Sequence, residues 1–210
     1  MNRRSFFGKL FGRSKPDDMV FFGVQVVFNA FGIEGLRKDL HHILAESEKD
    51  ELPEEKKRFY KKFISKLLEA KPYFEYGYWD YLPEEDDAEA EFQDWTTGIE
   101  ANLATEEEEL GEKADELSRF SSHQYYVVVS LCFLLEVTPE LDRFLTEIDI
   151  KEQDLFRRDT FAAILHAINY IDFEFAVADA VYIVPGNEED GFSQDDILSE
   201  GWQYLKPVES

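Results

Sequence analysis

Four stretches of the chain are dense in apolar, β-branched and aromatic residues, and each has the length of a strand. They are residues 19–30, 73–82, 125–135 and 175–184. Val, Ile, Phe and Tyr pack well on the pleated surface of a sheet, so this pattern predicts four strands. The third stretch is apolar at nearly every position, which is typical of a central strand that is covered on both faces.

Between these stretches, apolar residues recur every three or four positions, which is the spacing of an amphipathic helix. The spacing predicts helices over residues 33–48, from Pro53 to about residue 71, and over residues 155–171. A short helix follows Ser193, a residue type that favours the N-cap position. The helix that begins at Pro53 has a basic polar face made of Lys56, Lys57, Arg58, Lys61, Lys62 and Lys66.

Strands that alternate with helices predict an α+β fold, with a single sheet of about four strands and helices packed on at least one face. The 210 residues are enough for one well-packed domain. We therefore predict a basic, Phe-rich tail over residues 1–18 and one α+β domain over residues 19–210. Cys132 is the single cysteine, which excludes an internal disulfide and a cysteine-based metal site.

The charge of the chain is strongly negative and unevenly distributed. The formal net charge is -24, and residues 84–116 hold fifteen acidic residues and one lysine, a net charge of -14. Apolar residues spaced by three and four predict a helix within this segment, although Gly98 and Gly111 weaken its continuation. The apolar positions of that helix are Ala88, Phe92, Trp95 and Ile99.

An acidic surface of this size attracts cations and repels nucleic-acid phosphate. We therefore expect a basic protein partner and no nucleic acid. The residues expected to bind it are Glu84, Glu85, Asp86, Asp87, Glu106, Glu107, Glu108 and Glu109. Alternatively, basic residues of the same molecule neutralise the acidic segment, and these are Arg37, Lys38, Lys56, Lys57, Lys61 and Lys62.

The strand predicted over residues 73–82 is rich in tyrosine and tryptophan, which are common in binding hot spots. Strand alternation places Gly77 and Trp79 on one face and Tyr76 and Tyr78 on the other, and Gly77 is a candidate bulge. One face must cover the core and the other is then available for binding. Tyr76, Tyr78 and Trp79 are therefore candidate binding residues, and the alternative is that helices cover both faces.

The first sixteen residues carry a net charge of +5 and contain no acidic residue. This segment could contact an anionic membrane surface, dock on a partner or fold back onto the protein's own acidic segment. The contact residues would be Arg3, Arg4, Phe6, Phe7 and Phe11. No segment approaches the roughly 20 apolar residues of a membrane span. We expect a cytoplasmic protein. Peripheral contact with a membrane through residues 1–16 is an additional expectation.

Several short segments form a further pattern: residues 71–77 (KPYFEYG), residues 90–92 (AEF), the strand at 126–129 (YVVV) and, above all, the carboxyl end. There, residues 180–185 (AVYIVP) precede a DDIL segment and a YLKP segment. This pattern resembles an uncharacterised domain family of cyanobacteria and chloroplasts. The resemblance implies a bacterial protein with that family's fold and no assigned activity. Trp202-Gln203-Tyr204 departs from the family's usual ending.

No catalytic motif is present, and we predict no cofactor and no metal site. Asp172 and Glu174 are the best candidates for acid–base work, because two residues apart in a strand they would share one face. His42 and Glu46 could form one edge of a metal site, but a surface helix pair is the commoner arrangement. Three functions stay open: a non-enzymatic interaction protein, a small-molecule enzyme that uses the paired carboxylates, and an inhibitor that mimics nucleic acid.

Overall fold

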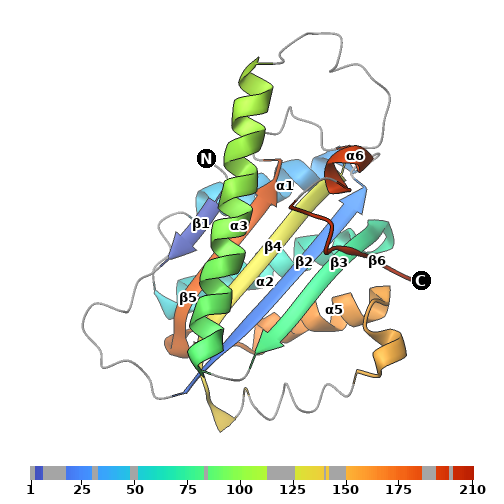
Figure 1. Ribbon diagram of the computed structural model, residues 1–210. Coiled ribbons are helices and arrows are strands. Elements are labelled where there is room, and N and C mark those ends of the chain that lie inside the picture. The colour runs from blue at the N-terminus through green and yellow to red at the C-terminus, as the bar shows by residue number, and fades with distance from the viewer. Residues whose placement is uncertain are drawn as a thin grey trace.

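In the part of the chain that the computed structural model describes, six antiparallel strands form one sheet in the order β1-β5-β4-β2-β3-β6 (Figure 1). The strands are β1 (Arg3–Phe6), β2 (Met19–Asn29), β3 (Phe74–Leu82), β4 (Tyr126–Glu136), β5 (Ala176–Val184) and β6 (Lys206–Pro207). The residues that the structure describes are 3–6, 18–29, 33–47, 52–82, 85–112, 126–139, 141, 150–185, 193–198 and 201–210.

The four predicted strands are confirmed as β2, β3, β4 and β5, and the short strands β1 and β6 extend the sheet at its two edges. β4 pairs with β2 over eleven consecutive positions and with β5 on its other side. The first ten residues of β4 are all buried, as expected for a central strand.

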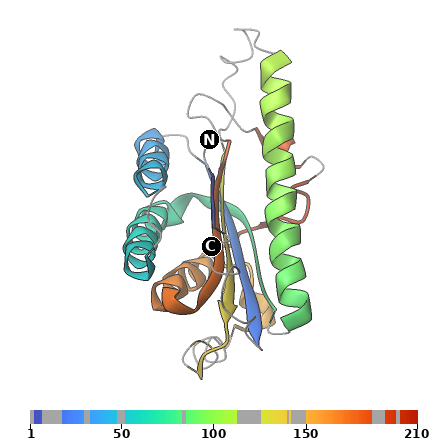
Figure 2. The ribbon, with the colours of Figure 1, turned by 90° about the vertical axis from the view of Figure 1, so that its left-hand side faces the viewer.

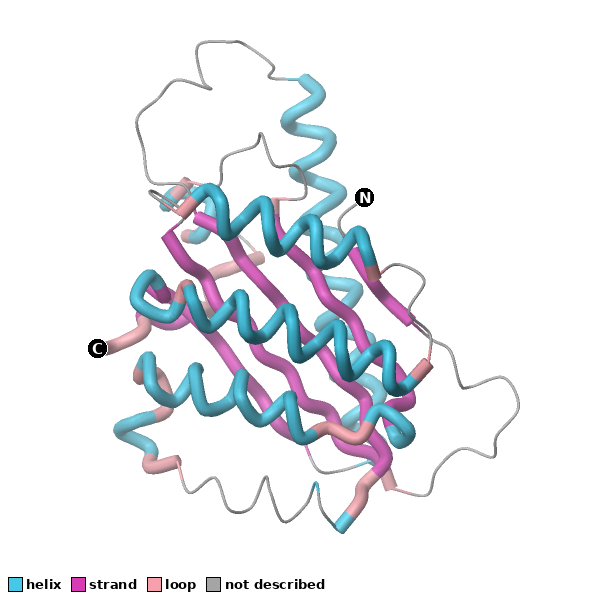
Figure 3. The backbone as a smooth tube through the Cα atoms, turned by 180° about the vertical axis from the view of Figure 1, so that it is seen from behind, coloured by secondary structure: helices cyan, strands magenta, loops and turns pink. Residues whose placement is uncertain are grey.

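Helices cover both faces of the sheet, so the predicted α+β class is confirmed. The α-helices are α1 (Glu34–Glu46), α2 (Pro53–Glu69), α3 (Glu85–Glu112), α5 (Arg158–Ala167) and α6 (Gln194–Ile197). Short 3-10 helices are η1 (Lys71–Tyr73), η3 (Glu152–Asp154), η4 (Ile168–Tyr170) and η5 (Phe173–Phe175). Figures 2 and 3 show α1, α2 and α5 side by side on one face, whereas α3 lies on the opposite face.

Each face of the sheet has its own hydrophobic core because side chains alternate along every strand. Phe22, Val24 and Val26 of β2 point to the core beneath α1, α2 and α5. Phe21 and Val27 point to the second core, which α3, α6 and the carboxyl-terminal residues cover. This double cover explains why antiparallel strands have continuous apolar runs, a pattern more typical of parallel sheets.

Two glycines in the sheet allow an aromatic ring of a helix to approach the backbone. A Cβ atom at Gly77 would lie 2.5 Å from the Phe161 ring of α5, and one at Gly23 would lie 2.8 Å from the Trp95 ring of α3. The register shift between β2 and β3 lies instead between Val27 and Phe28. The predicted bulge at Gly77 is therefore wrong, and this glycine provides room for a ring.

A buried ion pair joins α2 to β5. The Lys56 ammonium is paired with the Asp179 carboxylate, whose other oxygen accepts a hydrogen bond from the Tyr60 hydroxyl at 2.8 Å. Asp179 is completely buried, and the Phe173 ring stacks on Tyr60 at 4.9 Å. The placement of Lys56 on the exposed basic face of α2 was therefore wrong, because its side chain turns inward to neutralise a charge in the core.

Candidate functional site

The acidic segment forms a single long helix, α3, packed against the sheet by one apolar stripe. Ala88, Phe92 and Ile99 are buried on the sheet, as their spacing predicts. The helix continues through Gly98 and Gly111 and, at 28 residues, is about 42 Å long. Figure 1 shows its carboxyl end extending past the ends of the strands.

The sheet separates the most acidic helix from the most basic one. α3 contains twelve acidic residues and no basic residue, a net charge of -12. α2 contains six basic and three acidic residues, a net charge of +3, and lies on the opposite face. The alternative that the basic residues of α1 and α2 cover the acidic helix is therefore wrong for the described residues.

Two lysines of α2 form ion pairs with α1, within their own layer. Lys62 contacts Glu46 of α1 at 2.8 Å, and Lys66 contacts Asp39 of α1 at 3.2 Å. The hydrogen bond from Lys62, together with the nearby His42 charge, holds the pKa of Glu46 below its usual value. Lys62 and Lys66 therefore pair with carboxylates of α1, on the face of the sheet opposite α3.

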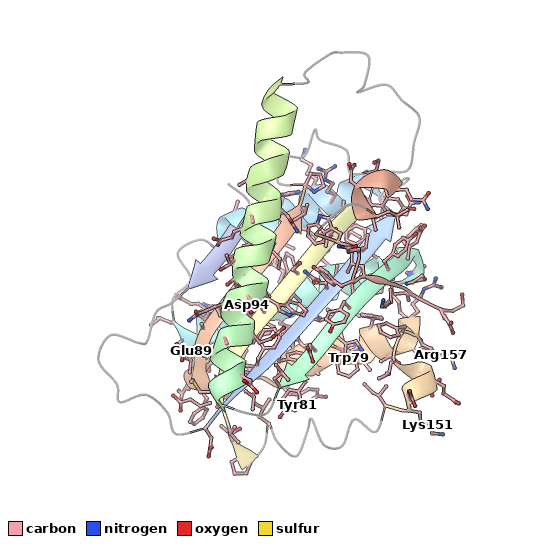
Figure 4. All side chains as sticks on the ribbon, in the orientation of Figure 1. Trp79, Tyr81, Glu89, Asp94, Lys151 and Arg157 are labelled. Atoms are coloured by element: carbon pink, nitrogen blue, oxygen red, sulfur yellow. The ribbon has the colours of Figure 1, made fainter. Side chains whose placement is uncertain are left out.

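The predicted acidic binding residues divide between described and undescribed positions. Asp87 is exposed on α3, and Asp94, which the prediction omitted, is exposed about two turns further on. Figure 4 shows Asp94 and Glu89 on α3, whereas Lys151 and Arg157 lie beyond β3 beside α5. Glu84 lies outside the described residues, and the backbone alone of α3 is described at Glu85, Asp86, Glu106, Glu107, Glu108 and Glu109.

The tyrosine and tryptophan residues of β3 pack against the cores on both faces of the sheet and are half-buried. Trp79 lies against the core under α5 and donates a hydrogen bond to the Leu155 carbonyl at 3.1 Å. Tyr76 contacts the Tyr126 ring at 6.1 Å, and Tyr78 lies on the α3 side of the sheet. The structure therefore agrees with the alternative to a free face, in which both faces of this strand are covered. Tyr78 lies next to Trp95 of the acidic helix and Tyr204 of the carboxyl-terminal segment.

Tyr78 belongs to a group of aromatic and acidic side chains where β3, α3 and the carboxyl-terminal segment meet. Its ring lies 5.8 Å from that of Trp95 and 5.5 Å from that of Tyr204. Trp95 donates a hydrogen bond to Glu91 at 2.8 Å. Burial raises the pKa of Glu91, and the nearby charges of Asp80 and Asp94 raise it further against the effect of that hydrogen bond.

The paired carboxylates proposed for catalysis do not share a strand face. Residues 173–175 form the 3-10 helix η5, and β5 begins only at Ala176. Asp172 is the N-cap of η5, since its Oδ1 accepts a hydrogen bond from the Glu174 backbone at 3.0 Å. Both side chains are exposed, and Asp172 has a structural role that accounts for its position.

Two further predictions concern metal binding and the amino terminus. His42 forms an i, i+4 pair with Glu46 at 3.1 Å, and among the described residues no group of three or more possible ligands is placed to hold a metal ion. Arg3–Phe6 is an edge strand paired with β5, so this part of the predicted tail belongs to the sheet. Phe7 and Phe11 lie outside the described residues.

No helix in the described part of the chain has the length and apolar character needed to cross a membrane. Comparison with protein-family models, curated proteins and solved structures finds no match to this chain. The resemblance noted from the sequence therefore stays a prediction, and a functional interpretation depends on the geometry and charge of the described residues.

Proposed function

We propose that this chain is a non-enzymatic interaction protein that binds a basic segment of a partner protein through the acidic helix α3. The observation that carries the proposal is the placement of α3 and α2 on opposite faces of the sheet. Half of the formal net charge of -24 comes from α3, and the lysines of α2 that form ion pairs bond within their own layer or in the core.

The physical argument is electrostatic. Many carboxylates on one rigid helix create a negative potential that raises the local concentration of cationic segments and speeds their association. The same potential disfavours nucleic acid, whose phosphates would be repelled. Individual exposed ion pairs contribute little, so the proposal requires several weak contacts in parallel.

The test is titration of the full-length protein with octa-lysine, a simple basic segment, at increasing salt. We expect binding that weakens steeply as salt rises, because exposed charges more than about 10 Å apart are screened at 0.1 M salt. Octa-glutamate is the control of opposite sign and should not bind. Absence of octa-lysine binding at low salt, or binding that is indifferent to salt, contradicts the proposal.

A further inference from the structure

Three aromatic rings and two carboxylates lie together beside α3, and we call them the aromatic–acidic patch. Tyr78 of β3, Trp95 of α3 and Tyr204 near the carboxyl terminus supply the rings. Asp80 and Glu91 supply the carboxylates, and the charges of both act on Tyr78. The five side chains come from three segments that are far apart in the sequence.

The patch is accessible although it borders the core. Tyr204 is 36% exposed, and Tyr78, Asp80, Glu91 and Trp95 are half-buried. A half-buried carboxylate close to other carboxylates is poorly stabilised, which agrees with the raised pKa of Glu91. A cation that bound here would relieve this repulsion.

A buried and unsatisfied acceptor lies beneath the patch. Gln25 of β2 stands directly opposite Tyr78 in the sheet. Its amide nitrogen donates to Ser130 at 2.9 Å, but its Oε1 atom accepts no hydrogen bond from any described group. Gln25 is 1% exposed, and an unsatisfied buried acceptor is costly.

We propose that the aromatic–acidic patch binds an arginine side chain of the basic partner, which extends the function proposed above and depends on it. A guanidinium group stacks on aromatic faces and presents five donors in a fixed plane. The patch offers aromatic rings and two carboxylates, which match those features. An ammonium group is more strongly hydrated and cannot stack in this way, so arginine is preferred to lysine.

The test compares octa-arginine with octa-lysine, which carry equal charge, on the full-length protein at one salt concentration. We expect octa-arginine to bind several-fold more tightly. Glu91→Gln removes the charge while its amide oxygen can still accept the Trp95 hydrogen bond, and we expect it to lower the octa-arginine affinity by about fivefold. Tyr204→Leu removes the most exposed ring and should lower it by roughly two- to fivefold.

The matched control is Asp87→Asn, which removes one exposed charge from the same helix outside the patch. It should lower the affinities for octa-arginine and octa-lysine slightly and equally, whereas Glu91→Gln should reduce the preference for octa-arginine. If the two peptides bind equally, or if Glu91→Gln and Asp87→Asn act alike, the patch is refuted and the acidic-helix function survives. If neither peptide binds, the proposed function fails and the patch with it.

Discussion

Replacement of Lys56 by methionine should destabilise the protein strongly, because it leaves the Asp179 carboxylate buried without its counter-charge. Methionine keeps most of the length of the lysine side chain, so the loss of stability measures the missing charge more than the missing packing. Breaking one side of a buried ion pair typically costs about 3–5 kcal/mol. That is a large part of the roughly 5–15 kcal/mol that stabilises an ordinary domain.

The assay is urea or thermal unfolding followed by tryptophan fluorescence. For a chain of this size, the loss corresponds to a fall in Tm of roughly 6–20 °C. Lys62→Met is the matched control on the same helix, since the Lys62–Glu46 pair is more than half exposed and its loss should change Tm little.

Removal of the whole buried network provides a second check. The combination of Lys56→Met, Tyr60→Phe and Asp179→Val leaves no charge and no hydroxyl at these three positions. We expect it to recover much of the stability lost in Lys56→Met, because apolar replacements of buried ion pairs are often neutral or stabilising. The reasoning is refuted if Lys56→Met costs no more than Lys62→Met, or if the triple variant is no more stable than Lys56→Met.

Further predictions use the same unfolding assay. Gly98→Ala should stabilise the protein by about 1 kcal/mol, since a Cβ atom at this helix position meets no atom within 4 Å. Gly77→Ala should lower the free energy of unfolding by about 1–3 kcal/mol, because its Cβ atom would clash with the Phe161 ring. The raised pKa of Glu91 means that its ionised form disfavours folding, so Glu91→Gln should be more stable than the parent protein at neutral pH. This difference in unfolding free energy should disappear below about pH 4.3, where the glutamate is protonated in both the folded and the unfolded state. A difference in stability that grows in acid contradicts this reasoning. Burial raises the pKa of the Cys132 thiol, so an aromatic disulfide reagent should modify it only when the protein unfolds, and rapid modification of the folded protein is the opposite result.

The strands and helices could be predicted from the sequence where a core imposes a clear period. The runs that became β2 and β4 are apolar because both of their faces are buried, and the α3 stripe is regular because one face packs on the sheet. β1 and β6 carry no such signal, since Arg3–Phe6 and Lys206–Pro207 are strands only through pairing with β5 and β3. Strand order is likewise a tertiary property.

Charged residues inside apolar segments carried a signal that the sequence interpretation missed. Asp179 interrupts an otherwise apolar strand, and a carboxylate in a buried strand requires a partner. The sequence shows that a partner is needed, but only the fold shows that it is Lys56, 123 positions earlier. Asp172 and Glu174 illustrate the opposite error, because period-two alternation does not apply to the 3-10 helix η5.

The acidic helix could be predicted from composition, whereas the aromatic–acidic patch could not. Tyr78 was identified as a candidate because its strand is rich in aromatics, but its neighbours Trp95 and Tyr204 belong to other segments of the chain. Nothing in the spacing of residues relates these three rings. Their proximity results from α3 crossing one face of the sheet and from the carboxyl-terminal segment packing beside it.

The most direct test of the acidic-helix function compares the removal of two carboxylates from α3 with the removal of two carboxylates elsewhere. The double variant of Asp87→Asn with Asp94→Asn removes two exposed carboxylates from α3, and Glu152→Gln with Glu174→Gln removes two exposed carboxylates elsewhere. The affinity for octa-lysine is then measured for both proteins at the same low salt. We expect the α3 variant to bind roughly two- to tenfold more weakly than the control variant. Equal affinities would show that α3 is not the binding surface.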